Sequence, residues 1–253
     1  MPSHLEPVSE PDRRFGVRTL LLAAAVALVA VPFLALLLLV EDRSTALMDI
    51  DAGARDGLHG YAVHHRLFVS MMRLLSDSGT SLAWTVIFLP VVGWLLWRRL
   101  PRLAAFVVTT VAVSSLLNNV VKLLVHRTRP VLRDSLAHAG GASFPSGHAQ
   151  AAIVGYGVLI LIFRSTLRGV WRHAATVAGV VMVLAIGFSR VALGLHYVSD
   201  VLAGYLLGGA WVVAMTAAFS AWQRERGLPA VEPDEGLSPD LADGPAPKSG
   251  RPQ

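Results

Sequence analysis

The sequence contains no cysteine and few charged residues. Asp, Glu, Lys and Arg make up 15% of its 253 residues, whereas a soluble domain carries about 25%. Without cysteine, the chain can form neither disulfides nor thiolate metal sites. Hydrophobic residues account for 54% of the chain, and the mean hydropathy is +0.56. This composition excludes an ordinary soluble domain and indicates an integral membrane protein.

The formal net charge of +5 does not indicate nucleic-acid binding. Such binding requires Lys and Arg gathered on a polar surface, and this apolar chain has little polar surface. The sequence also has no cluster of carboxylates with metal-binding spacing. We therefore expect no nucleic-acid partner, no metal and no other cofactor, and we expect the lipid bilayer to surround most of the chain.

Long apolar segments predict an all-α, polytopic membrane protein with six transmembrane helices. A helix needs about 17 to 25 residues to cross a bilayer. Segments of this kind lie at residues 17–40, 80–97, 103–125, 147–163, 174–190 and 197–219. The first is longer than the apolar core of a signal peptide, which has about 7 to 15 residues, so we interpret it as a retained anchor.

The remaining segments predict two tails and one long connection. Residues 1–14 form an N-terminal tail, residues 15–222 the membrane domain, and residues 223–253, rich in proline and acidic residues, a disordered C-terminal tail. The longest connection, residues 41–79, contains the stretch HHRLFVSMMRLL. Its pattern is typical of an amphipathic helix that lies on the membrane surface.

Basic residues outside the motifs described below predict the orientation of the chain. The positive-inside rule places connections rich in Lys and Arg on the cytoplasmic side. With both termini in the cytoplasm, that side receives Arg13, Arg14, Arg18, Arg98, Arg99, Arg102, Arg164, Arg168, Arg172, Arg224, Arg226, Lys248 and Arg251. We therefore expect cytoplasmic termini in a cell membrane.

Three polar clusters interrupt the apolar pattern, all on the predicted outer side. The first, KLLVHRTRP, places Lys122 near the end of the third predicted helix and Arg129 seven residues later. Two helical turns span about seven residues, so both cations can face the same way, although Pro130 disfavours a helix through Arg129. For this cluster alone, the alternative is that the basic side chains simply reach toward lipid headgroups.

The second cluster, FPSGHA, precedes an apolar run. A helix that begins near Ser146 directs the free amides of Ser146, Gly147 and His148 outward, together with the positive end of the helix dipole. Such a helix end binds anions, and Gly147 lets an anion approach the backbone closely. Simple capping explains Ser146 but leaves His148 unexplained.

The third cluster, SRVALGLHYVSD, contains Arg190, His196 and Asp200. On a helix, His196 and Asp200 share a face, so the carboxylate can accept the inner N–H of the imidazole and fix its tautomer. A buried His–Asp pair with a purely structural role is the alternative. The neighbouring Arg190 and the membrane boundary make that alternative less favourable, because ionisable residues there are commonly functional.

Together, the clusters combine three cations, helix amides and two histidines. Cations and backbone N–H groups suit a phosphate or a similar oxyanion. The histidines suit a nucleophile and a general acid. In this hypothesis His196, neutral and oriented by Asp200, attacks phosphorus, and protonated His148 delivers a proton to the departing oxygen.

The same residues carry a family resemblance. K-x6-RP at 122–130, PSGH at 145–148 and SR-x5-H-x3-D at 189–200 resemble, in order and spacing, the three-part signature of the type 2 phosphatidic acid phosphatase superfamily. The resemblance covers about residues 15–222 and implies a phosphohistidine on His196, with His148 as the acid. It also implies that the phosphoryl oxygens are held by Lys122, Arg129, Ser146, Gly147 and Arg190.

The motifs and the resemblance predict an integral membrane phosphatase that removes the terminal phosphate of a lipid at the outer leaflet. The superfamily acts on phosphatidic acid, phosphatidylglycerol phosphate, polyprenyl diphosphates and related lipids. The motifs do not indicate which of these lipids is the substrate, and they do not indicate an oligomeric state. One alternative is a lipid-phosphate binding or flipping protein without turnover. The other is an enzyme similar to vanadium haloperoxidases, against which the six spans and the short 131–144 connection argue.

Overall fold

The computed structural model describes residues 10–132, 136–137, 139–164 and 166–225, and its regular secondary structure in these ranges is helical. The helices are α1 (Glu10–Glu41), α2 (Thr45–Ala62), α3 (Arg66–Ser78), α4 (Ser81–Trp97), α5 (Pro101–Val125), α6 (Gly147–Phe163), α7 (Val170–Ala192) and α8 (Val198–Glu225). The predicted all-α class is confirmed. Most of the two predicted tails, residues 1–9 and 226–253, lies outside the described residues.

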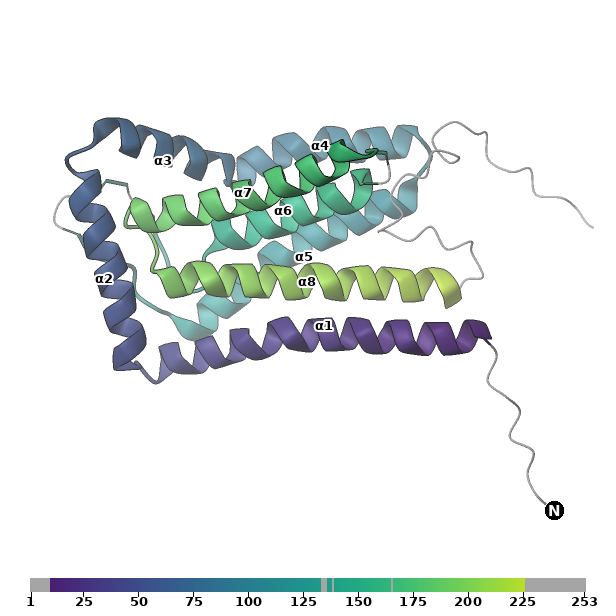
Figure 1. Cartoon of the computed structure of the whole chain (residues 1–253), viewed down its shortest axis with the longest axis horizontal. Coiled ribbons are helices and arrows are strands. Elements are labelled where there is room, and N and C mark those ends of the chain that lie inside the picture. Colours follow the sequence, from purple (N-terminus) through teal and green to yellow (C-terminus); the bar gives the residue numbers. More distant parts are fainter. Residues whose placement is uncertain (1–9, 133–135, 138, 165, 226–253) are drawn as a thin grey trace, which may run out of the picture.

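The long helices lie side by side, and α2 lies across one end of them (Figure 1). Helix α8 packs against α1 and α6, and α6 also packs against α7 and α5. Helix α3 packs on α7, and α4 packs on α5. As a result, α6, which carries the predicted anion-binding end, is surrounded by α4, α5, α7 and α8.

Each of the six predicted segments lies largely within one helix. By length and composition, α5, α7 and residues 198–220 of α8 can each cross a membrane. Helices α3 and α4 meet at a bend of 46° and together make a fourth candidate span. Two apolar helical segments are shorter: the 17-residue helix α6, and Val26–Glu41 within α1. The chain is a helical membrane protein, and its six crossings stay a prediction.

The predicted long outer connection contains two helices where the sequence indicated one. Helix α3 holds most of the predicted amphipathic stretch. Helix α2 was missed, because TALMDIDAGARDGLHGYA contains three glycines and few large apolar residues, which lowers its intrinsic helix propensity. Packing against α7 and α8 stabilises this helix in the fold.

Large apolar side chains cover the outside of the bundle as well as its core. Phe106 and Ile162 are fully buried between the helices, whereas Leu89 and Leu124 are exposed. Exposure of this kind suits contact with lipid. Trp97 and Trp171, 77% and 70% exposed, lie at the end of the bundle opposite α2, where amphipathic rings favour a membrane–water interface.

Candidate active site

The three predicted clusters meet at the end of the bundle that α2 covers. Helix α5 ends where His126 adopts a left-handed conformation with φ of 50°, and the chain then continues without helix through Arg129. Helix α7 ends at Ala192, and Gly194, with φ of 70°, turns the chain toward His196. These two turns bring the first and third clusters to the start of α6.

His196 and Asp200 lie together at the centre of this region. His196 is 1% exposed, and its Nδ1 lies 3.4 Å from Oδ2 of Asp200 in the first turn of α8. The two residues do not share a helix face, because His196 precedes α8. With Asp200 as the acceptor, Nδ1 carries the proton and Nε2 carries a lone pair.

The pKa of His196 is lowered to about 4, mainly by burial; Asp200 opposes this shift, and Arg129 and Arg190 add to it. The desolvation penalty falls on the charged imidazolium, which is why burial acts in this direction. His196 is therefore neutral at pH 7, as a nucleophile must be.

Arg129 faces the free nitrogen of His196. Its Nη1 lies 3.1 Å from Nε2 of His196 and donates to the carbonyl of Leu195 at 2.8 Å. Its Nε lies 3.2 and 3.1 Å from the carbonyls of Gly140 and Gly141. Burial lowers the pKa of Arg129 from that of a free guanidinium, but an arginine remains charged in proteins. Arg129 reaches this position from a loop after α5, consistent with the expectation that Pro130 disfavours a helix through Arg129.

The start of α6 lies against Lys122. A Cβ atom at Gly147 would lie 3.7 Å from Nζ of Lys122 and 3.2 Å from Oδ1 of Asn118. Gly147 therefore keeps the backbone open at the point where a cation faces the positive end of the helix. A single anion placed there can interact with the ammonium group and the helix amides together.

Ser146 caps α6 as predicted, since its Oγ accepts the amide of Ala149. The sequence predicted a free amide at Ser146, and this was wrong, because the amide donates to the carbonyl of Asp200 at 2.9 Å. This bond joins the second cluster to the third. It requires Gly204, because a Cβ atom there would lie 2.5 Å from the carbonyl oxygen of Ser146. The amides of Gly147 and His148 precede the first intrahelical bonds and remain as donors.

Arg190 presents a buried donor that has no partner among the residues that the structure describes. The residue is 6% exposed, and its Nη1 donates to Oγ of Ser76 on α3. Its buried Nε has no hydrogen-bond acceptor among the described residues. A buried guanidinium N–H without an acceptor is costly, so this donor indicates a site for an oxyanion.

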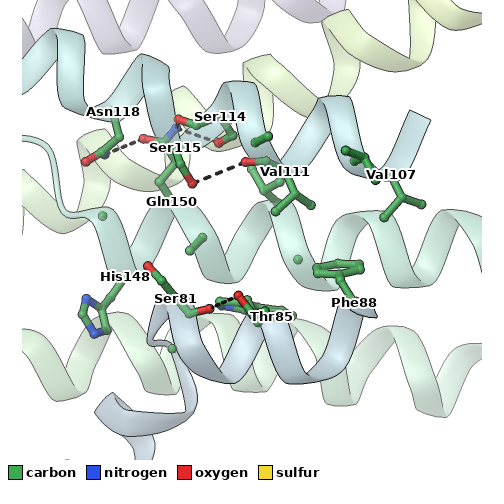
Figure 2. Close-up of a pocket in the computed structure, with 18 of the residues that line it drawn as sticks. Ser81, Thr85, Phe88, Val107, Val111, Ser114, Ser115, Asn118, His148 and Gln150 are labelled. Atoms are coloured by element: carbon green, nitrogen blue, oxygen red, sulfur yellow. Dashed lines mark hydrogen bonds between the residues drawn. The ribbon is translucent and has the colours of Figure 1, made fainter. Parts of the chain in front are cut away.

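His148 lies at the mouth of a cavity of about 590 Å³ between α4, α5 and α6 (Figure 2). A Cβ atom at Gly79, in the turn before α4, would lie 3.3 Å from Cδ2 of His148. Gly147 precedes His148 in the chain and lies close to Lys122, and both residues line the cavity. The end of the cavity away from His148 is apolar, with Phe88 and Val107. The cavity therefore leads from the charged residues into the apolar part of the bundle.

One wall of this cavity carries a short polar strip. Gln150 of α6 accepts from Nδ2 of Asn118 at 2.6 Å and donates to Oγ of Ser114 at 2.8 Å (Figure 2). Asn118 and Ser114 both belong to α5. These bonds fix α5 against α6 beside Lys122, and they satisfy polar groups that would be costly to bury alone.

Two residues that hold the Asp200 carboxylate in place were not predicted from the sequence. Arg127 donates from Nη1 to Oδ1 of Asp200 at 2.7 Å and from Nη2 to Oδ2 of Asp51 at 2.8 Å. Arg127 stands within the KLLVHRTRP stretch, but nothing in the stretch separates its role from that of Arg129. Asp51 belongs to the helix that was not predicted and offered no signal.

No group of three or more His, Cys, Asp or Glu side chains in the described ranges is placed to hold a metal ion. The arrangement around His196 combines a neutral imidazole with cations and helix amides. Such a set of groups suits transfer of a phosphoryl group without a change of oxidation state.

Residues 103–224 match the sequence model of the PAP2 superfamily. The chain is 43% identical over 96 residues to phosphatidylglycerophosphatase B of Bacillus subtilis, covering 37% of this chain and 46% of that one. It is 32% identical over 124 residues to lipid A 1-phosphatase of Rhizobium etli, covering 46% and 49%. These matches span about half the length of each relative.

Two further similarities extend over more of the chain. Undecaprenyl-diphosphatase of Sulfolobus acidocaldarius is 28% identical over 148 residues, covering 56% of this chain and 66% of that one. The crystal structure of a transmembrane PAP2-type phosphatidylglycerolphosphate phosphatase from Bacillus subtilis superposes with a TM-score of 0.69 at 22% identity, covering 79% of this chain and 96% of that one. The helical arrangement is therefore that of a known membrane fold.

Proposed function

We propose that this chain, whose residues 103–224 match the sequence model of the PAP2 superfamily, is an integral membrane phosphatase that hydrolyses the terminal phosphate of lipid phosphates. The observation that carries the proposal is the buried Nε of Arg190, which has no partner in the described part of the chain, in a site where Arg129 faces Nε2 of His196. A bound phosphoryl group accepts a hydrogen bond from Nε of Arg190 while its phosphorus faces Nε2 of His196. The names of the relatives, all of them phosphatases of lipid phosphates or diphosphates, support the same reaction.

The reaction proceeds through two displacements at phosphorus. Nε2 of His196 attacks, an N–P bond forms, and the bond from phosphorus to the lipid oxygen breaks. Protonated His148 gives its proton to that oxygen, so the lipid leaves as an alcohol or, from a diphosphate, as the monophosphate. The bound phosphate itself favours the charged imidazolium, because opposite charges stabilise each other. In the second displacement a water oxygen attacks phosphorus, His148 accepts a proton from that water, and the N–P bond breaks, which restores neutral His196 and releases inorganic phosphate.

The cavity beside His148 supports a lipid as the substrate. It begins at Lys122 and Gly147 and continues between apolar side chains such as Phe88 and Val107. A phosphate held by the charged end leaves the attached chain free to enter the apolar end, where burial of each CH₂ contributes about 0.8 kcal/mol. Phosphatidic acid, phosphatidylglycerol phosphate and polyprenyl diphosphates all combine these two parts.

The phosphatase proposal is tested by phosphate release from a panel of these lipid phosphates with the purified chain in detergent. The wild-type chain releases phosphate from at least one of them, with and without EDTA, and His196→Ala releases none because no other group can attack. Binding of lipid phosphate without release would favour a binding or flipping protein instead. Activity lost with EDTA and restored by Mg²⁺ would contradict the metal-free reaction.

In the proposed topology, six crossings place the site at the outer leaflet and both termini in the cytoplasm. Arg98, Arg99 and Arg102 follow α4 at the end of the bundle opposite the site, in agreement with the positive-inside rule. Single cysteines at exposed Ala139 and Thr166 provide the test, since the chain has none of its own. Ala139→Cys reacts with an impermeant reagent in intact cells, and Thr166→Cys reacts only after permeabilisation. The reverse pattern would place the site in the cytoplasm.

A further inference from the structure

A buried network of charged groups lies on the side of Asp200 away from the phosphate-binding residues. Asp51 of α2 is 1% exposed, and Arg127 contacts both Asp51 and Asp200 at 2.8 and 2.7 Å. Nη1 of Arg127 also donates to Oγ of Ser199 at 2.6 Å. Asp51 accepts the amide of Ser199 at 3.0 Å and the hydroxyl of the same residue. The network therefore ties α2 to the first turn of α8.

These bonds, more than the bond to His196, determine where the Asp200 carboxylate lies. Oδ1 accepts from Arg127 at 2.7 Å and Oδ2 accepts from the amide of Tyr197 at 2.9 Å, whereas Nδ1 of His196 is 3.4 Å away. The guanidinium of Arg127 also lies 4.4 Å from the ring centre of Tyr197. Short bonds to a charged donor are the strong ones, so Arg127 anchors the carboxylate that orients the imidazole.

We propose that Asp51 and Arg127 are positioning residues for the phosphatase reaction, holding Asp200 where it fixes the tautomer and direction of His196. The inference rests on the proposed function, because it assigns His196 as the nucleophile. Asp51 lies outside residues 103–224, so the nucleophile depends on a helix beyond the part that matches the superfamily. Neither residue is needed to contact the substrate.

The network also sets the charge that Asp200 presents to His196. Around His196, Arg129 comes from the loop after α5, Arg190 from α7, Lys122 from α5, and His148 from α6. Asp200 faces this group as an anion, and Asp77 acts on Arg190. Arg127 partly neutralises Asp200, and Asp51 partly neutralises Arg127. Removal of Arg127 strengthens the negative charge felt by His196, and removal of Asp51 weakens it.

The two changes therefore shift the acid limb of the pH–rate profile in opposite directions. Arg127→Gln makes His196 easier to protonate and moves the limb to higher pH. Asp51→Asn makes His196 harder to protonate and moves the limb to lower pH. Both lower kcat, by up to about 10²-fold, because the nucleophile loses its alignment. KM changes little, since the phosphate-binding residues stay in place.

The experiment measures kcat, KM and the pH profile of both variants on a lipid phosphate that the wild-type chain hydrolyses, with elution from a sizing column as the check on folding. Asp56→Asn is the matched control, because Asp56 is an exposed carboxylate on the same helix that pairs with Arg55. The control keeps wild-type kinetics. Asp51→Asn/Arg127→Gln, which removes one charge of each sign, shows a defect smaller than the product of the two single defects.

Shifts in the same direction, a raised KM at unchanged kcat, or equal kinetics for Asp51→Asn and Asp56→Asn would each overturn the proposal. If a single variant elutes as an aggregate, the charge-balanced double variant replaces it, and wild-type kcat in that variant would also overturn the proposal. A wild-type chain that releases no phosphate would instead refute the phosphatase function itself. An active His196→Ala would leave the phosphatase function standing and refute the assignment of His196 as the nucleophile.

Discussion

The two sides of His196 are built in different ways. On the side of Nε2 lies Arg129, and the nearby Arg190, whose charge also acts on His196, has a buried Nε without a partner within the described residues. On the side of Nδ1, Asp200 and Arg127 are joined by short bonds to the protein itself. The first side is suited to an anion that arrives and leaves, and the second to a permanent orientation. Nucleophilic catalysis needs both, because alignment and charge stabilisation are separate contributions to the rate.

The largest effect is expected from a change on the open side. His148→Ala lowers kcat severely on an alkyl phosphate, whose alkoxide leaves poorly, and less on p-nitrophenyl phosphate, whose phenolate needs little protonation. The difference between the two substrates falls in the range of about 10² to 10⁴-fold that general acid catalysis contributes. Steady-state rates of the variant and the wild-type chain on both esters provide the measurement. Equal defects on both would remove the acid role from His148.

The next effect concerns the histidine between the two sides. The pKa of His196 is lowered to about 4 by burial, with Asp200 opposing and Arg129 and Arg190 adding to the shift. Protonation consumes the lone pair of Nε2, so the acid limb of kcat/KM lies near that value and kcat/KM falls about tenfold per pH unit below it. The fold also loses stability as pH falls from the ordinary value of 6.5 toward 4, because the unfolded chain binds the proton first. A rate profile with an acid limb near pH 6.5 would contradict this reading.

The smallest effect lies farthest from the chemistry, in the cavity on the open side. Ala112 lines this cavity from α5, so Ala112→Trp obstructs the apolar part and leaves the charged end unchanged. It lowers kcat/KM about tenfold for a long-chain lipid phosphate and leaves p-nitrophenyl phosphate hydrolysis unaltered, because only the lipid uses the blocked volume. Ala105→Trp, on the same helix but outside the cavity lining, is the matched control. An equal loss on both substrates in Ala112→Trp would show that the cavity does not hold the lipid chain.

Much of the membrane core was predictable because long apolar runs admit few structures in a bilayer. Helices α4, α5 and α6 begin and end close to the predicted residues, and Ser146 caps α6 as its position before the apolar run indicates. Helix α2 was not predictable, since its three glycines and polar residues give a weak local signal and its stability comes from neighbouring helices. Asp51, which α2 carries, was missed for the same reason.

By itself, the sequence determined the chemical groups of the site: an apolar all-helical chain, a helix start with open amides, three cations, and a histidine four residues before a carboxylate. These features are local, and short-range sterics and polarity specify them. Only the tertiary structure decided which groups meet. It placed Arg129 at His196 from a loop, bonded the amide of Ser146 to α8, and set Asp51 behind Arg127. Such contacts depend on the packing of distant helices, which no local pattern in the sequence encodes.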